Sequence, residues 1–264
     1  LPIFGQMGGT SAVAPGVAGL VALVLAAVPT LSDRQLEHVL VLSTQQRLRD
    51  EALYAKDHAN GGFFLGARGA EFPWIVNAAG LAHSSLLGFG VPDAVRAIEM
   101  AQRTDLYWYN LPEQKSASRV FALGDGRVSA GSSQIYAEHV DGTADLRRVE
   151  RVQLVLSLDA PSKLSTLRIE VESPAGTVSR LWPETRHTQT SLRWVLSSVK
   201  FWNEPIDGMW KVRFLNSGAT RAVVHSLALT FHGYGDVVTG RSDGLVYDRV
   251  FETGDAVTDM RELV

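Results

Sequence analysis

The sequence has 264 residues, of which 45% are hydrophobic and 20% charged, with a formal net charge of −3 at pH 7. This composition is typical of a globular protein, and it offers no basic footprint for nucleic acid. The absence of cysteine excludes disulfides and thiolate metal sites. The longest apolar stretch, residues 17–28, is too short to cross a bilayer, so no membrane segment is expected. The chain begins without Met and without a basic secretion signal, which we interpret as a fragment, a processed product or a trimmed form.

A glycine-rich turn near the start of the chain is followed by a serine at the beginning of a predicted helix. Gly8 and Gly9 precede Thr10 and Ser11, and the sequence then stays apolar and helix-forming up to Val28. A helix N-terminus offers free N–H groups and a partial positive charge, so Ser11 could serve as a nucleophile or simply as an N-cap. We expect Pro15 to be tolerated in the first turn, and the helix to be buried on most faces because it is apolar nearly all round.

The stretch resembles the serine motif of the subtilisin-like proteases, which reads Gly-Thr-Ser-x-Ala-x-Pro followed by Val-Ala-Gly. Residues 9–19 match this motif at every specified position except residue 13, where Val replaces Ala. By that resemblance Ser11 is the acylating serine, and its backbone N–H is one donor of the oxyanion hole. A capping box at Ser32 and Gln35 predicts a second helix with Leu36, Val39 and Leu40 on one face.

Residues 74–81 and 88–94 resemble the kexin and furin branch of these proteases, which carries Asn-x-Ala-Gly followed by Tyr-Gly-Phe-Gly-x-Val-Asp-Ala. The chain departs from that pattern at Ser85, Leu87 and Pro92. From the residues themselves we predict turn and capping roles for Asn77 and Asp93, with Pro92 at a first helical position. The helix that follows runs to about Gln102, with one face lined by Val91, Val95 and Ile98.

The second half of the chain changes to a period of two, which predicts short antiparallel strands with one buried face. The alternating residues are Val152, Leu154, Leu156 and Leu158; Leu167, Ile169 and Val171; Trp210, Val212 and Phe214; and Val223, His225, Leu227, Leu229 and Phe231. Residues 173–176, Ser-Pro-Ala-Gly, predict a β-turn. Residues 167–181, 201–204, 208–212 and 227–233 resemble the P (Homo B) domain of kexin-like proteases, a jelly-roll sandwich that packs on the catalytic domain and supports its folding.

The expected fold is therefore mixed: the C-terminal part of an α/β subtilisin-like domain, followed by an all-β antiparallel jelly-roll sandwich. We expect the catalytic-domain portion at residues 1–104, a linker at 105–117, the P domain at 118–233 and an acidic tail or linker at 234–264. The resemblance implies structural calcium, with sites mostly outside this chain, and a secreted or extracytoplasmic location; it assigns no metal ligand here.

A protease of this family also needs an Asp, a His and an oxyanion Asn, all of which precede the serine. None of the seven histidines fills that gap by its spacing, so we expect the chain alone to be nearly inert. Three interpretations stay open. The chain is part of a serine endopeptidase that acts on protein or peptide substrates once joined to the N-terminal portion, or a non-catalytic binding or folding module, or a pseudoprotease. No nucleic-acid or membrane partner is expected.

Overall fold

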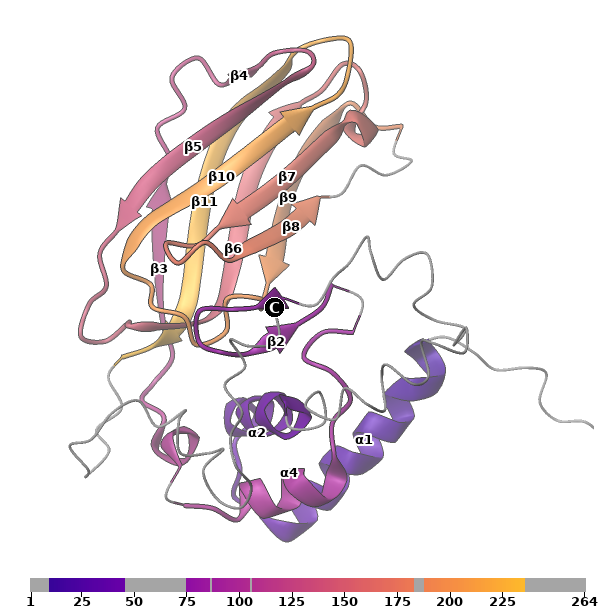
Figure 1. The fold of residues 1–264 in the computed structure, drawn as a ribbon, viewed down its shortest axis with the longest axis vertical. Coiled ribbons are helices and arrows are strands. Elements are labelled where there is room, and N and C mark those ends of the chain that lie inside the picture. The colour runs from indigo at the N-terminus through magenta and orange to yellow at the C-terminus, as the bar shows by residue number, and fades with distance from the viewer. Residues whose placement is uncertain (1–9, 46–74, 86, 105, 183–187, 236–264) are drawn as a thin grey trace, which may run out of the picture. The chain divides into compact units, whose positions relative to one another are not determined.

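The computed structural model describes residues 10–45, 75–85, 87–104, 106–182 and 188–235 (Figure 1). The chain divides into two compact units. Unit 1 consists of residues 1–75, 82–111 and 239–264, and unit 2 of residues 76–81 and 112–238. Each unit is described by itself.

The described part of unit 1 is mainly helical. Its helices are α1 (Thr10–Ala27), α2 (Asp33–Gln45) and α4 (Ala94–Ala101), with a short 3-10 helix η2 (Tyr107–Asn110). The predicted capping box of α2 is confirmed, because Ser32 N–H donates to Gln35 Oε1 at 2.9 Å and Gln35 N–H donates to Ser32 Oγ at 3.2 Å. Val39 and Leu42 of α2 are fully buried, and so is Trp108 of η2, a residue in the stretch predicted as a linker.

Helix α4 lies where the sequence predicts a helix, but two details of the prediction are wrong. Pro92 precedes the N-cap Asp93, so it stands outside the helix rather than at its first position. The buried face holds Ala97 and Ala101, whereas Val91 and Val95 are exposed. Small side chains allow α4 to lie close against its neighbours α1 and α2, which explains why alanines rather than valines form the contact.

Unit 2 is an antiparallel sandwich of two sheets, which confirms the predicted fold class (Figure 1). One sheet has the order β5 (Ser132–Val140), β10 (Gly208–Asn216), β7 (Leu167–Glu172), β8 (Val178–Trp182). The other has the order β3 (Lys115–Val120), β11 (Ala222–Tyr234), β6 (Arg148–Asp159), β9 (Ser191–Ser198), and β4 (Arg127–Val128) also pairs with β11. A 3-10 helix, η3 (Leu164–Thr166), precedes β7.

The core of the sandwich follows from the alternation of apolar residues in the strands. The predicted inward residues of β6, β7 and β10 are all buried, and Trp210 packs its ring against Phe201 and Phe231 with centroid separations of 5.2 and 4.8 Å. Aromatic contacts of this kind add to the stabilisation from burial alone. The predicted β-turn is also confirmed, since Gly176 N–H donates to Ser173 O at 3.0 Å and Gly176 has a φ of 89°.

The prediction for the first part of β11 is wrong. Val224 is buried there, and His225 is exposed. The pairing of β11 with β6 shifts between Val224 and Ser226, which is a β-bulge. Because a bulge inserts one residue, it reverses the inward and outward positions on its two sides, and the period of two breaks there.

A two-stranded sheet joins β1 (Ile75–Val76) to β2 (Ala82–His83), and residues 77–81 form the turn between them. The chain leaves unit 1 after Ile75, passes through this turn as part of unit 2, and returns to unit 1 at Ala82.

Candidate functional site

Ser11 is the second residue of α1, and its side chain is exposed. The first N–H groups of a helix have no partner within the helix, so the backbone N–H of Ser11 is available to an oxyanion. No acidic residue lies in the first turn of α1 to oppose a developing negative charge. The glycines of the motif, Gly8 and Gly9, lie outside the described residues.

Pro15 lies farther into α1 than the sequence predicts. The helix begins at Thr10, so the nitrogen of Pro15 stands where it would bond the carbonyl of Ser11 four residues earlier. Proline has no N–H, and this carbonyl therefore receives no helical hydrogen bond. The start of α1 therefore has one helical hydrogen bond fewer at Ser11.

Helix α1 is not buried on most faces, which corrects the prediction from its composition. Among its described side chains Val24 alone is classed as buried, whereas Val13 and Leu23 are 63% and 56% exposed. An 18-residue helix without a charged residue that presents this much apolar surface has the composition of a core element. Its composition therefore implies apolar contacts that the described residues do not supply.

Among the residues that the structure describes, Ser11 forms no hydrogen bond with a histidine or a carboxylate. The three described histidines of unit 2 have partners within that unit. His139 Nδ1 lies 3.2 Å from Asp141 Oδ1, and His225 Nε2 lies 2.8 Å from Asp159 Oδ2. His232 lies 2.7 Å from Ser116 Oγ and 2.9 Å from Gln153 Oε1. Among the described residues, therefore, no histidine is hydrogen-bonded to Ser11 as a general base.

Asn77 organises a second polar centre, within unit 2. Its Oδ1 accepts hydrogen bonds from the N–H groups of Ala79 at 3.0 Å and Leu81 at 2.9 Å, which confirms the predicted turn role. Its Nδ2 donates to Lys200 O at 3.0 Å and to Trp202 O at 2.9 Å. The sequence does not predict the bonds to Lys200 O and Trp202 O. It shows that an amide can donate hydrogen bonds, but not which carbonyls distant in the chain lie near it.

Glu204 completes this centre with a fully buried carboxylate. Its Oε1 accepts hydrogen bonds from Ala78 N–H at 2.8 Å and from the hydroxyl of Thr177. The neighbouring Lys200 is buried as well, and burial lowers the pKa of its ammonium, with a smaller contribution from the charge of Arg180. Residues 200–204 thus hold the turn 77–81 through buried hydrogen bonds, and Thr177 in turn binds the carboxylate of Glu204.

Asp93 has the capping role that the sequence predicts. It is the N-cap of α4, and its Oδ1 accepts from Arg96 N–H at 3.1 Å. This carboxylate is therefore committed to helix capping.

Two further properties concern the described residues alone. They include no group of three or more His, Cys, Asp or Glu side chains arranged to hold a metal ion. None of the described helices combines the length and the apolar character that a membrane span requires.

Two protein families match the chain by sequence. The subtilase family matches residues 2–90, and the proprotein convertase P-domain matches residues 149–231. The chain is 28% identical over 242 residues to neuroendocrine convertase 2 of Caenorhabditis elegans, covering 85% of this chain and 36% of that protein. It is 30% identical over 250 residues to human proprotein convertase subtilisin/kexin type 4, and the match covers 90% of this chain and 29% of that protein.

Bacterial relatives match as well. The Aeromonas extracellular serine protease of Aeromonas sobria is 29% identical over 243 residues, covering 83% of this chain and 37% of that protein. The crystal structure of the serine protease of Aeromonas sobria superposes with a TM-score of 0.67 at 21% identity, covering 88% of this chain and 45% of that one. The fold is therefore shared, and the chain spans between 29% and 37% of the length of these three curated relatives.

Proposed function

Because the chain belongs to the kexin and furin branch of the subtilisin-like serine proteases, we propose that it forms part of a serine endopeptidase in which Ser11 is the nucleophile. The observation that carries the proposal is the position of Ser11 at the exposed start of an apolar helix, inside the stretch matched by the subtilase family. Its partner is the N-terminal portion of the same protease, with the catalytic Asp and His and the oxyanion Asn.

The chemistry follows from this division of groups. The histidine of the N-terminal portion takes the proton of Ser11 Oγ as this oxygen attacks the carbonyl carbon of a peptide bond. The backbone N–H of Ser11, together with the Asn side chain, stabilises the resulting oxyanion. The same histidine then protonates the leaving amine, and water releases the acyl group from Ser11 by the reverse sequence of proton transfers.

The exposed apolar surface of α1 supports the need for the N-terminal portion. A helix with exposed Val13 and Leu23 and one buried side chain among those described is stabilised when further apolar surface covers it. The proposal therefore assigns two roles to the N-terminal portion: it supplies the general base for Ser11, and it covers the apolar surface of α1 that the described residues leave exposed.

A fluorophosphonate probe tests the proposal, since it labels a serine that an adjacent histidine activates. We expect strong labelling of Ser11 when the chain is co-expressed with the N-terminal portion, little labelling of the chain alone, and none in the Ser11→Ala variant. Ser32→Ala is the matched control, because Ser32 also stands at a helix start but caps α2. Absence of labelling in the joined protein would support the pseudoprotease, for which the departures at Ser85 and Leu87 are the sequence argument.

The second candidate function is a non-catalytic binding or folding module built on the sandwich. It is favoured by the separate core of unit 2, which is centred on Trp210. A partner that binds residues 112–235 with the same affinity as it binds the whole chain would support this alternative.

The cofactor and the location are further parts of the proposal. The resemblance implies structural calcium, for which we expect the sites mostly in the N-terminal portion. We also propose a secreted or extracytoplasmic location, in line with a relative described as an extracellular serine protease.

A further inference from the structure

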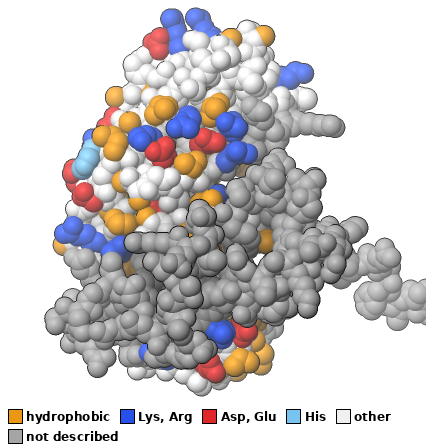
Figure 2. All heavy atoms as spheres, in the orientation of Figure 1, with side chains coloured by type: hydrophobic (Ala, Val, Ile, Leu, Met, Phe, Trp, Pro, Cys, Tyr) orange, Lys and Arg blue, Asp and Glu red, His pale blue; other side chains and the backbone are white. Residues whose placement is uncertain are grey.

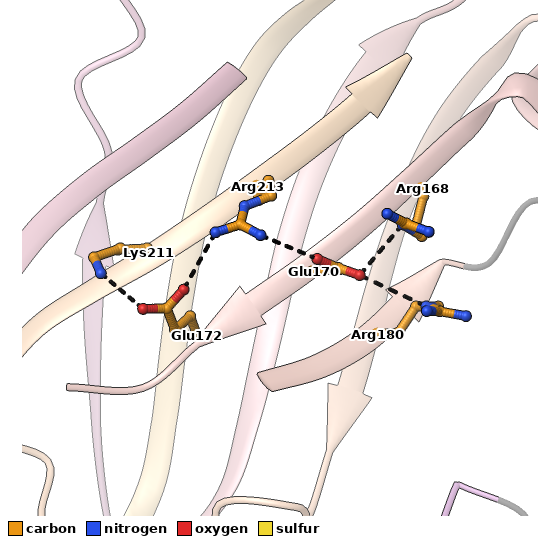
Figure 3. Close-up of polar contacts among 6 residues, drawn as sticks. All are labelled: Arg168, Glu170, Glu172, Arg180, Lys211 and Arg213. Carbon is orange, nitrogen blue, oxygen red and sulfur yellow. Dashed lines mark hydrogen bonds and ion pairs between the residues drawn. The ribbon is translucent and has the colours of Figure 1, made fainter. Parts of the chain in front are cut away.

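The outer face of the sheet β5-β10-β7-β8 carries a cluster of six charged side chains, which we call the arginine face: Arg168, Glu170, Glu172, Arg180, Lys211 and Arg213 (Figure 3). The strand register brings them together, because Lys211 pairs with Glu172, and Arg213 pairs with Glu170, which pairs with Arg180 on the other side. Figure 2 shows basic, acidic and hydrophobic side chains interspersed on the molecular surface seen from this side.

The two carboxylates lie deeper than the cations. The side chains of Glu170 and Glu172 are 11% and 22% exposed, whereas those of the four cations are 33–40% exposed. Arg213 lies between both carboxylates, with its NH1 3.8 Å from Glu170 Oε2 and its NH2 3.5 Å from Glu172 Oε2. The carboxylates thus hold the cations in place from below, and an excess of two positive charges faces outward.

The guanidinium groups retain free donors. Lys211 Nζ donates to Glu172 Oε1 at 2.7 Å. Arg168, Arg180 and Arg213 form ion pairs at 3.3–3.8 Å, but none donates a hydrogen bond to another of the residues that the structure describes. A guanidinium offers five N–H donors in a planar fork that fits a carboxylate, so this face is prepared to receive one from outside.

Exposed apolar side chains border the charges on the same face. Ile135 of β5 pairs in register with Arg213, Val178 of β8 pairs with Glu172, and Met209 lies two residues before Lys211 on β10. These three side chains are classed as exposed. An extended peptide that carries both acidic and apolar side chains on one of its faces contacts both kinds of group, whereas a sulfated glycan uses the cations alone.

We propose that the arginine face is a docking surface for an extended acidic segment of a partner protein, which pairs carboxylates with Arg180 and Arg213 and packs apolar side chains on Ile135 and Val178. The proposal does not depend on Ser11, so it stands or falls separately from the proposed protease activity. Charge complementarity carries it: the whole chain has a net charge of −3, but this face is positive.

Fluorescence anisotropy with the 264-residue chain and a labelled peptide of repeating Glu-Ser-Leu-Ser tests the proposal. When this peptide is extended, its Glu and Leu side chains lie on the same face. We expect saturable binding that weakens at high sodium chloride, and about tenfold weaker binding in the double variant Arg180→Gln, Arg213→Gln, since exposed charge contacts are screened and additive only in part. Glu172→Gln should bind more tightly, because it removes a repulsive charge and keeps all four cations.

Arg127→Gln is the matched control, because Arg127 also forms an exposed ion pair, with Asp125 at 3.6 Å, but belongs to β4 of the other sheet. Unchanged binding in this variant supports the proposal, provided that circular dichroism shows each variant folded. Equal weakening by Arg127→Gln, no binding of the peptide, or binding of a heparin oligosaccharide in place of the peptide would overturn it.

Discussion

The buried side chain of Asn77 forms four hydrogen bonds. Its Nδ2 donates two of them, and its Oδ1 accepts the other two. Asn77→Ala would leave the carbonyls of Lys200 and Trp202 without these donors, and we expect a loss of about 3 kcal/mol in the free energy of unfolding. Asn77→Asp should be as harmful although it keeps the size, because an oxygen would then face the two carbonyls. Urea unfolding followed by tryptophan fluorescence measures the change.

Asn110→Ala is the control for this prediction, since Asn110 is exposed in η2. It should alter the stability by less than about 0.5 kcal/mol, as surface substitutions generally do. Equal stability of the Asn77 and Asn110 variants would show that the turn 77–81 does not support the fold.

His232 makes the sandwich sensitive to mild acid. Burial lowers the pKa of His232, the charge of Arg151 lowers it further, and Glu150 opposes them with a smaller effect; the ring faces Ser116 and Gln153. The unfolded chain, with a pKa near the ordinary value of about 6.5, then binds the proton more readily than the folded chain. The contribution of His232 to the free energy of unfolding is fully present above pH 6.5. It decreases as the pH falls from there towards the lower pKa that His232 has in the folded chain.

Thermal unfolding at a series of pH values checks this direction. His232→Gln should flatten the decrease in stability below pH 6.5, because glutamine does not titrate. Thr230→Ser, a substitution at a residue of the same strand that does not titrate, should not flatten it. An unchanged slope in His232→Gln would contradict the role given to this residue.

At the scale of elements, the pairing of β6 with β11 requires glycine at position 233. A Cβ placed on Gly233 would lie 1.8 Å from the carbonyl oxygen of Arg148, and the register shifts between His232 and Gly233. The paired backbone of β6 cannot move aside as a flexible side chain can. Gly233→Ala should therefore destabilise the sandwich by about 3 kcal/mol or more. Differential scanning calorimetry would show a lower melting temperature.

Gly131→Ala separates this steric effect from backbone conformation. Gly131 has a φ of 64° but nothing within 4 Å of an added Cβ, so only the left-handed conformation opposes the alanine. We expect a loss of about 1 kcal/mol there. A larger loss at Gly131 than at Gly233 would refute the argument from the close approach of β6.

Helix α1 should make the isolated chain associate with itself. Val13 and Leu23 are exposed on a helix without charges, and such apolar surface is covered in a stable protein. Leu23→Ser should therefore reduce self-association in sedimentation velocity, whereas Val195→Ser, at a valine of similar exposure on β9, should have little effect. A monomeric chain with α1 unchanged would contradict this expectation.

The strands could be predicted from the sequence because each inward side chain meets the same core. Leu154 and Leu156 alternate with outward residues, as do Val212 and its neighbours, and the structure confirms the alternation. The prediction failed at Val224, since a bulge is a feature of the pairing of two strands and leaves no mark in one of them. It also failed at α1, because an apolar composition indicates that a helix needs burial and not whether the described residues provide it.

The candidate site shows the same limit. Ser11 is recognisable because the motif around it is continuous in sequence. The bonds of Asn77 to Lys200 and Trp202 span 123 and 125 residues, and nothing local indicates them. The arginine face also depends on the strand register, which places Arg180 and Arg213 on either side of Glu170.

At the scale of the whole molecule, the assignment of residues 76–81 to unit 2 has a measurable consequence. The fragment Pro112–Gly235 keeps the core around Trp210, Phe201 and Phe231, so we expect it to fold. It loses the N–H of Ala78 that bonds Glu204 and the amide of Asn77 that bonds two carbonyls. Water replaces part of these bonds, so the loss of stability should be smaller than for Asn77→Ala in the intact chain.

A synthetic peptide of residues 75–83 provides the test. Because it binds the folded fragment in preference to the unfolded one, it should raise the melting temperature progressively with the logarithm of its concentration. The same peptide with Asn77→Ala should have little effect, since it cannot donate to Lys200 O and Trp202 O. If both peptides stabilise the fragment equally, the turn is held by its backbone contacts and not by the side chain of Asn77. If neither does so, the turn belongs to the sandwich only while the chain on both sides of it is intact.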